Sequence, residues 1–252
     1  MLRQRIIPCL LLSKNSLVKT LRFKDPKYLG DPLNAIRIFN DKEIDELIVL
    51  DIEATKFNRD PNYELISRIT KECKSPITYG GGIRNIDQAE KIISLGVERV
   101  SLCSAIKNNL KLIKELSNSL GSQSVVIVME VLKIQGSNNS YQLYNANKNI
   151  DLLKFSQKIE EFGAGEIIVS CINKDGTRSG YDIDLIKLFK ENCTIPITAL
   201  GGADNINDIK KLFNSIGIVG AAAGSMFTLT GKYRSLLIQY PNKDEKRLIY
   251  LG

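Results

Sequence analysis

The sequence predicts a (β/α)8 barrel, and three observations lead to that prediction. The chain has 252 residues, a usual length for such a barrel. Its two halves repeat one another at a spacing of 120 residues. Within each half, short apolar runs alternate with segments of helical periodicity. We therefore expect a single domain over residues 1–252, built from half-barrels of about 1–120 and 121–252.

The repeat is clearest where PITYGGGIRN (76–85) is set against PITALGGADN (196–205). The same spacing aligns DELIVLD (45–51) with GEIIVSC (165–171), and RIIPCL (5–10) with VVIVME (125–130). Because order, spacing and apolar pattern agree, we interpret the chain as an internal repeat. Two equal halves of four strands favour a closed barrel over the alternative, a doubly wound open sheet.

The eight expected strands are short and continuously apolar, which is typical of parallel strands covered on both faces. They are 5–11, 47–52, 76–80 and 98–103, then 124–131, 166–171, 196–200 and 217–223. The first lies in MLRQRIIPCLLLSKN, where two arginines precede an apolar run. That run has no small-residue cleavage site after it, so we interpret it as a strand and not a signal peptide. We expect a cytoplasmic protein.

Helix starts are marked by capping residues between these strands. Asn85 precedes a helical pattern with Gln88 at the capping-box position, and Asn205 precedes another with Asp208. In the first copy Ile86, Ala89 and Ile93 form one apolar face, and in the second Ile209 and Leu212 do the same.

Composition excludes several kinds of chemistry. The chain has no histidine, so histidine bases, Ser/His/Asp triads and histidine metal ligands are all excluded. Five cysteines are scattered singly, without zinc or redox spacing, so we expect reduced thiols, no metal and no other cofactor (Cys9, Cys73, Cys103, Cys171, Cys193). No apolar run is long enough to span a bilayer. A net charge of +7 fits an anionic small molecule; nucleic acid is the poorer interpretation because no basic stripe carries interleaved aromatics.

Glycine pairs fall where the third and seventh strands end. In a barrel the C-terminal ends of the strands carry the chemistry. Backbone N–H groups of glycines before a helix can approach a phosphate closely. Because the pair occurs twice, we expect two phosphate sites on opposite sides of the mouth. Ser104 and Gly224-Ser225 follow the fourth and eighth strands and belong to the same expectation.

The runs RIIPCL, DELIVLD, GGGIR, GSQSVV and GAGEIIVSCINKDGTRSGYD together resemble the cyclase subunit of imidazole glycerol phosphate synthase. The resemblance covers essentially the whole chain. It implies a (β/α)8 barrel that uses ammonia from a glutaminase partner and a substrate with a phosphate at each end. It also places Asp51 and Lys19 on active-site positions. Residues in both glycine-rich regions are assigned phosphate contacts (Gly81, Gly82, Ser104, Asp175, Gly176, Gly202, Gly224, Ser225).

Three positions depart from the family pattern. Where the family has one acid–base aspartate at the end of strand one and another at the end of strand five, this chain has Leu11 and Glu130. The usual asparagine at the end of strand four is Cys103. Loss of a positioned acid or base typically costs about 10²–10⁴-fold in rate, so we expect cyclase activity to be lost. The alternative is that a neighbour such as Asp51 replaces the lost aspartate.

The segment IPCLLLSKNSLVKTLRFKDPKYLGDP resembles a subgroup of this family. That resemblance implies a role beside a glutaminase and an ATP-dependent sugar amidotransferase, in converting an acetamido group of a surface-polysaccharide sugar into an acetamidino group. The segment also supplies a basic loop after the first strand, which suits an anionic ligand and a lid.

Four expected strands open with a charged residue: Arg5, Glu46, Arg99 and Glu166. Such charges at a barrel end are usually solvated. In the family the matching positions form a salt-bridged gate through which ammonia enters from the glutaminase docked at the N-terminal face. We therefore expect an ammonia conduit that is retained while the reaction is replaced. The alternatives are an authentic histidine-pathway cyclase and a non-catalytic phosphate-binding scaffold for the glutaminase. We expect no nucleic acid and no membrane as partner.

Overall fold

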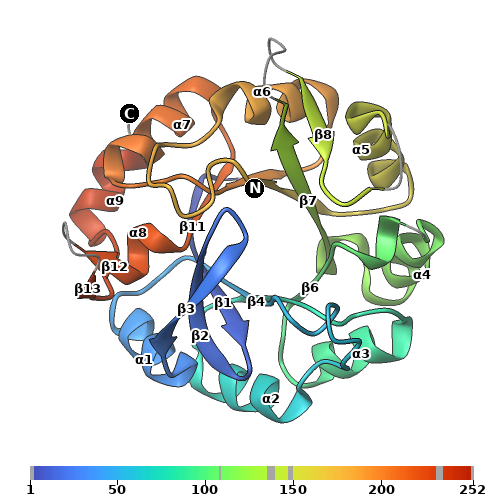
Figure 1. The fold of residues 1–252 in the computed structure, drawn as a ribbon, viewed down its shortest axis with the longest axis horizontal. Coiled ribbons are helices and arrows are strands. Elements are labelled where there is room, and N and C mark those ends of the chain that lie inside the picture. Colours follow the sequence, from blue (N-terminus) through green and yellow to red (C-terminus); the bar gives the residue numbers. More distant parts are fainter. Residues whose placement is uncertain (1–2, 108, 135–139, 147–149, 231–234, 251–252) are drawn as a thin grey trace.

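Eight parallel strands form a closed barrel, with helices around it (Figure 1). The computed structural model describes residues 3–107, 109–134, 140–146, 150–230 and 235–250. Strand β11 pairs with β1 and closes the sheet, which confirms the predicted (β/α)8 class. In barrel order the strands are β1 (Arg5–Ser13), β4 (Leu47–Asp51), β5 (Ile77–Gly80), β6 (Arg99–Leu102), β7 (Val125–Lys133), β9 (Glu166–Cys171), β10 (Ile197–Leu200) and β11 (Gly220–Ala223).

The strands bury both faces, and this explains their continuous apolar sequence. Successive side chains of a strand point to opposite faces. In β1, Ile6 and Leu10 pack into the layer between the barrel and its helices. Ile7, Cys9 and Leu11 point into the lumen, where they join a second, smaller apolar cluster. The barrel interior is thus lined by one residue in two from each strand.

The helices begin where the capping residues predict. The Asn85 side chain accepts from the N–H of Gln88, and Asn205 and Asp208 form a reciprocal capping box. The described helices are α1 (Pro32–Asp41), α2 (Tyr63–Glu72), α3 (Ile86–Ser94), α4 (Lys111–Leu120), α5 (Leu152–Glu161), α6 (Ile183–Asn192), α7 (Ile206–Ile216), α8 (Ser225–Thr228) and α9 (Lys243–Tyr250), with short 3₁₀ turns η1 (Ala105–Lys107) and η2 (Ser122–Ser124). In the described part of the chain, none of these helices has the length and apolar character needed to cross a bilayer.

The prediction of a loop after the first strand is wrong. That segment forms an antiparallel hairpin of β2 (Ser16–Leu21) and β3 (Lys24–Gly30), which extends β1 beyond the mouth. Two-residue turns with positive φ at both positions, Lys14–Asn15 and Arg22–Phe23, reverse the chain. Such turns match the twist of paired strands, and this local geometry outweighs the polar, loop-like composition. In the second half, β8 (Tyr141–Leu143) extends β7 in the same way but is shorter. Beyond α8, β12 (Leu229–Thr230) and β13 (Ser235–Leu236) form a separate small pair.

Three strand boundaries differ from prediction by two residues or more. The last strand begins at Gly220 and not at 217, because Gly217 ends α7 with a positive φ of 84°. The first and fifth strands run two residues further than expected, to Ser13 and Lys133, because each continues as one arm of its hairpin.

Candidate functional site

A cavity of about 680 Å³ opens at the C-terminal ends of the barrel strands. All the predicted acid–base, lysine and phosphate-contacting positions line it, from residues as distant in sequence as Leu11 and Ser225. The cavity reaches down to Cys9, Ser101 and Val128 inside the lumen. The residues that the sequence singled out at separate strand ends therefore meet around one cavity, and their roles stay predictions.

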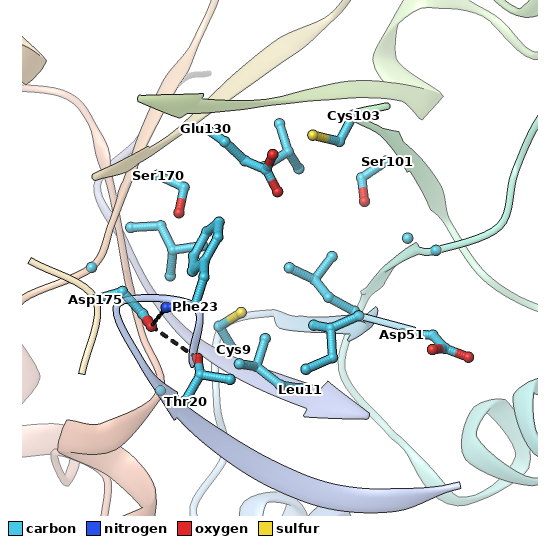
Figure 2. Close-up of a pocket in the computed structure, with 18 of the residues that line it drawn as sticks. Cys9, Leu11, Thr20, Phe23, Asp51, Ser101, Cys103, Glu130, Ser170 and Asp175 are labelled. Atoms are coloured by element: carbon cyan, nitrogen blue, oxygen red, sulfur yellow. Dashed lines mark hydrogen bonds between the residues drawn. The ribbon is translucent and has the colours of Figure 1, made fainter. Parts of the chain in front are cut away.

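The cavity has one polar and one apolar wall (Figure 2). Neighbouring strands β6, β7 and β9 supply the polar wall, with Ser101, Cys103, Glu130 and Ser170. Ser101 Oγ is buried and has no hydrogen-bond partner among the described residues. The facing strands β10, β1 and β4 supply leucine side chains (Leu11, Leu50, Leu200).

Leu11 and Glu130 face one another across the cavity. Strand β7 is the fourth neighbour of β1 around the eight-stranded barrel in either direction, so the two strands lie opposite one another. Leu11 is 9% exposed and packs with the lumen cluster. The polar wall keeps a carboxylate, and the facing wall has none at the matching position.

Glu130 has a cationic partner that the sequence did not suggest. Lys107, in η1 after β6, lies with its Nζ 3.3 Å from Glu130 Oε2 and donates to Tyr144 O at 2.8 Å. Tyr144 N in turn donates to Glu130 O at 2.8 Å. The spacing of the two residues in the sequence did not predict this pair. The one available signal was a lysine a few residues after the end of β6, the strand next to β7.

The cysteines in the cavity are held as thiols. Burial raises the pKa of Cys103 strongly, and the adjacent Glu130 carboxylate raises it further, against the opposite effect of Lys107. Burial raises the pKa of Cys9 to about 12, despite the nearby Lys19 ammonium. Neither side chain is a ready nucleophile at neutral pH, because the thiolate is the reactive form.

Asp175 anchors the hairpin over the cavity. Its carboxylate accepts from Lys19 Nζ at 3.2 Å, from Thr20 Oγ1 at 2.9 Å and from Phe23 N at 3.2 Å. Arg22 N also donates to Asp175 O at 3.0 Å. The side chain predicted to contact phosphate is thus occupied by protein donors, and its observed contacts hold the β2–β3 turn.

Lys19 connects this anchor to the second glycine-rich region. A Cβ built on Gly224 would lie 3.1 Å from Lys19 Nζ, so the ammonium lies against that glycine. Gly176, Gly202 and the buried Ser225 line the same part of the cavity. A cation beside exposed backbone N–H groups is what an anion site needs, and phosphate binding there stays a prediction.

The glycine pairs also have a purely structural cause. Gly82 has φ 77°, and a Cβ there would lie 2.9 Å from Arg59 O. Gly202 has φ 104°, and a Cβ would lie 2.2 Å from Gly180 O. Both positions require glycine because the neighbouring loop backbone packs against them. The repeat of the pair therefore follows from packing alone, and Gly81 and exposed Ser104 line the cavity beside the first pair.

Asp51 lies at the edge of the cavity, with its carboxylate directed away from Leu11 (Figure 2). Its Oδ1 accepts from the N–H groups of Glu53 and Ala54, at 2.9 and 3.0 Å. Arg59 Nη2 is 3.7 Å from the same oxygen. These contacts stabilise the loop after β4, and the geometry does not favour Asp51 as a replacement for the lost aspartate.

The four charges predicted at the floor of the barrel form a closed ring. Arg5 bonds Glu46 at 3.1 Å and Glu166 at 2.9 Å, and Arg99 bonds the same two carboxylates, Glu166 at 2.7 Å. The four side chains are only 7–16% exposed. They are not solvated rim charges, because each has its partners inside the ring.

Mutual neutralisation makes this ring possible in a buried place. Burial alone would raise the pKa of Glu166, but Arg5, Arg99 and a hydrogen bond from Thr198 outweigh it and hold the pKa below its usual value. The pKa of Arg5 is raised by Glu166 and Glu46, which outweigh the opposing effect of burial. Above the ring, mostly aliphatic side chains fill the lumen up to the cavity (Ile7, Ile48, Val126, Ile168, Ala222).

Residues 5–234 match a family model with the description "Histidine biosynthesis protein". The chain belongs to this family. One relative, from Vibrio vulnificus, is provisionally named imidazole glycerol phosphate synthase subunit HisF3. It is 47% identical to this chain over 98% of this chain and 96% of its own. A Pseudomonas aeruginosa relative, provisionally named subunit HisF2, is 47% identical over 97% of this chain and 98% of its own. The imidazole glycerol phosphate synthase subunit HisF of Streptococcus mutans is 36% identical over 90% of this chain and 91% of its own.

Membership of the histidine biosynthesis family agrees with the cyclase-subunit resemblance on which the strand-end assignments were based. Among the cavity residues that sequence reasoning missed are Thr20 and Phe23 from the hairpin, Lys107 after β6, and Tyr144 after β8. Phe23 and Tyr144 meet edge to face, with ring centroids 6.1 Å apart, so the hairpin spans the mouth to the β7 side.

Proposed function

We propose that this chain is the barrel subunit of a glutamine amidotransferase complex, which receives ammonia from a glutaminase at the floor of the barrel. In this proposal the ammonia is delivered for conversion of an acetamido group into an acetamidino group on a surface-polysaccharide sugar, together with an ATP-dependent sugar amidotransferase. The observation that carries the proposal is the combination of a complete charged ring at the floor with Leu11 at the mouth.

The ring supports the entry of ammonia. Four alternating charges that neutralise one another can be buried at a strand end, whereas a ring with no function would more simply be replaced by apolar side chains. The lumen above it is mostly apolar, which suits passage of a small uncharged molecule. A glutaminase docked below the ring would place its ammonia at the entrance.

The cavity supports a changed reaction at the exit. Closure of an imidazole ring by two acid–base groups needs one group on each side of the substrate. Of the two facing positions, Leu11 and Glu130, only Glu130 on β7 carries a carboxylate. In agreement with this, the relatives with provisional names are 44–48% identical to this chain, while four relatives with the plain HisF name are 36% identical.

A second candidate function is that of an authentic histidine-pathway cyclase. One observation favours it: Lys107 stands beside Glu130, so the polar wall holds a carboxylate and an ammonium in contact. In this alternative the pair would replace the two aspartates, and the products would be imidazole glycerol phosphate and aminoimidazole carboxamide ribotide.

The deciding experiment measures ammonia-dependent turnover of the substrate of imidazole glycerol phosphate synthase. The purified chain is compared with a Leu11→Asp, Glu130→Asp double variant. We expect no turnover by the parent chain and a measurable rate in the double variant, because a positioned acid or base contributes about 10²–10⁴-fold. Turnover by the parent chain at the rate of the family enzymes would contradict the proposal and support the second function.

A second assay distinguishes delivery from scaffolding. Glutaminase turnover is measured with and without this chain, using a glutaminase subunit of the imidazole glycerol phosphate synthase type. A subunit that takes up ammonia is expected to raise glutaminase turnover, whereas a mere phosphate-binding tether leaves it unchanged.

A further inference from the structure

Lys107 connects three parts of the mouth. It closes η1 after β6, its Nζ lies 3.3 Å from Glu130 Oε2 on β7, and it donates to Tyr144 O at 2.8 Å in the segment after β8. Its side chain is 12% exposed, and that of Glu130 is 25% exposed. The ion pair is therefore mostly screened from solvent and worth more than a surface pair.

The backbone and the side chain of Glu130 are held by the same neighbours. Tyr144 N bonds Glu130 O, and Tyr144 O receives the Lys107 ammonium. The ring of Tyr144 contacts Phe23 at the hairpin turn. Lys107 is thus the one side chain in the described part of the chain that forms an ion pair with Glu130, and it is itself fixed by the loop that also fixes the Glu130 backbone.

Glu130 Oε2 lies 3.3 Å from Lys107 Nζ, and the carboxylate projects into the cavity on the same side as Ser101 and Cys103 (Figure 2). The lumen opens into the cavity at this level, since Cys9, Ser101 and Val128 line its deepest part. Across from it, the Leu11 wall offers no hydrogen-bond acceptor on its side chain. An uncharged N–H donor leaving the lumen therefore meets its strongest acceptor at Glu130.

We propose that Lys107 is the positioning residue of this cavity, which holds the Glu130 carboxylate over the end of the lumen as the acceptor for the N–H groups of arriving ammonia. The inference rests on the proposed function in one respect only, the passage of ammonia through the lumen. The placement of Glu130 by Lys107 is independent of it. Without the ammonium, a glutamate with free χ angles and one exposed side turns toward solvent.

The test compares Lys107→Met, Lys107→Gln and Lys107→Arg with a matched control, Lys111→Met, an exposed lysine at the start of α4. Met keeps the length of the aliphatic stem and removes the charge. Gln keeps one donor and provides a second variant if Lys107→Met folds poorly. Crystal structures of the parent, Lys107→Met and Lys107→Arg chains show where Glu130 lies. Steady-state kinetics with ammonium chloride, measured on the complex with the sugar amidotransferase in the presence of ATP and an acetamido sugar, give KM for ammonium and kcat separately.

We expect the Glu130 carboxylate to leave the lumen axis in Lys107→Met and to keep its place in Lys107→Arg. The KM for ammonium is expected to rise about tenfold or more in Lys107→Met with a smaller change in kcat, because a misplacement of about 1 Å is enough for effects on the order of 10²-fold. The KM for ammonium of Lys107→Gln is expected to lie between those of the parent and Lys107→Met. The KM of Lys111→Met is expected to equal that of the parent.

An unmoved Glu130 in Lys107→Met overturns the inference whatever the function of the chain. A displaced Glu130 with unchanged KM for ammonium overturns the role of Glu130 as the ammonia acceptor. If the complex of the parent chain with the sugar amidotransferase shows no ammonium-dependent turnover of an acetamido sugar, the proposed function fails, and the crystal structures still decide whether Lys107 positions Glu130.

Discussion

At the scale of single residues, the chemistry of the cavity depends on a few exchanges between polar and apolar side chains. Leu11 makes one wall inert where a carboxylate would face the ligand, and Glu130 keeps a carboxylate on the other. Asp175 is the other acidic side chain whose contacts are decisive, because its three hydrogen-bond donors all belong to the hairpin over the mouth. One buried carboxylate therefore fixes an element that begins more than 150 residues earlier in the chain.

Asp175→Asn is expected to release the hairpin. The substitution removes the charge that Lys19 and Thr20 approach, and hydrogen bonds to a charged group contribute roughly 1.5–3 kcal/mol each. We expect the free energy of unfolding to fall by about 1–3 kcal/mol and the amides of 16–30 to exchange faster with deuterium. Asp25→Asn, at an exposed position on the same hairpin, serves as the control. Unchanged exchange in Asp175→Asn would show that the turn geometry alone holds the hairpin.

At the scale of elements, the two halves repeat their capping as well as their strands. Helices α3 and α7 both begin at an asparagine whose side chain accepts from the first turn. In α7 the box is complete, since Asp208 accepts from the N–H groups of Asp204 and Asn205. In α3 the corresponding Gln88 accepts from Arg84 N instead, one residue earlier. These caps set the direction in which each helix leaves the glycine-rich loop.

Asn205→Ala is expected to destabilise the protein by about 1 kcal/mol, the usual effect of removing an asparagine N-cap. For a chain of this length the melting temperature should fall by about 2–4 °C. The matched control is Asn207→Ala, because Asn207 is exposed within the first turn and its side chain caps nothing in the described structure. Equal melting temperatures for the two variants would contradict a stabilising role for the capping box.

At the scale of the whole molecule, the two ends of the barrel differ in chemistry. The charged ring closes the N-terminal end and the cavity opens at the C-terminal end, with the lumen between them. Because the pKa of Glu166 is held below its usual value in the folded state, the unfolded chain takes up that proton first as the pH falls. The contribution of the ring to stability is therefore present above the ordinary glutamate pKa of 4.5 and is lost as the pH falls below it.

Reversing the charge at Glu46 is expected to separate two kinds of flux. In Glu46→Lys both arginines lose a partner, so glutamine-dependent delivery of ammonia should fall strongly while delivery from added ammonium chloride is spared. Breaking a buried pair costs about 3–5 kcal/mol, so Glu46→Gln is made in parallel as the milder variant. Glu43→Gln, an exposed change before the same strand, is the control. Equal loss of both fluxes would contradict the role of the ring as an entrance.

The sequence predicted most of the fold because the information is local. Apolar runs of four to nine residues, helix caps and the 120-residue repeat are all contained in short stretches, and each indicates its element without reference to the rest. The hairpin after β1 was not predicted, because Arg22 and Phe23 are unusual residues for a turn with two positive φ values. Its geometry depends on Asp175, which is far away in the chain.

The sequence by itself determined the barrel, the apolar Leu11 and the carboxylate of Glu130 near two of its strand ends, and the four charges at the floor. Only the tertiary structure decided that those charges close into one ring, that Asp175 holds the hairpin, and that Lys107 holds Glu130. The physical reason is that strand and helix preferences act over neighbouring residues. A pair such as Lys107 and Glu130, 23 residues apart, exists only where the pairing of β6 with β7 brings the turn after one strand beside the other strand.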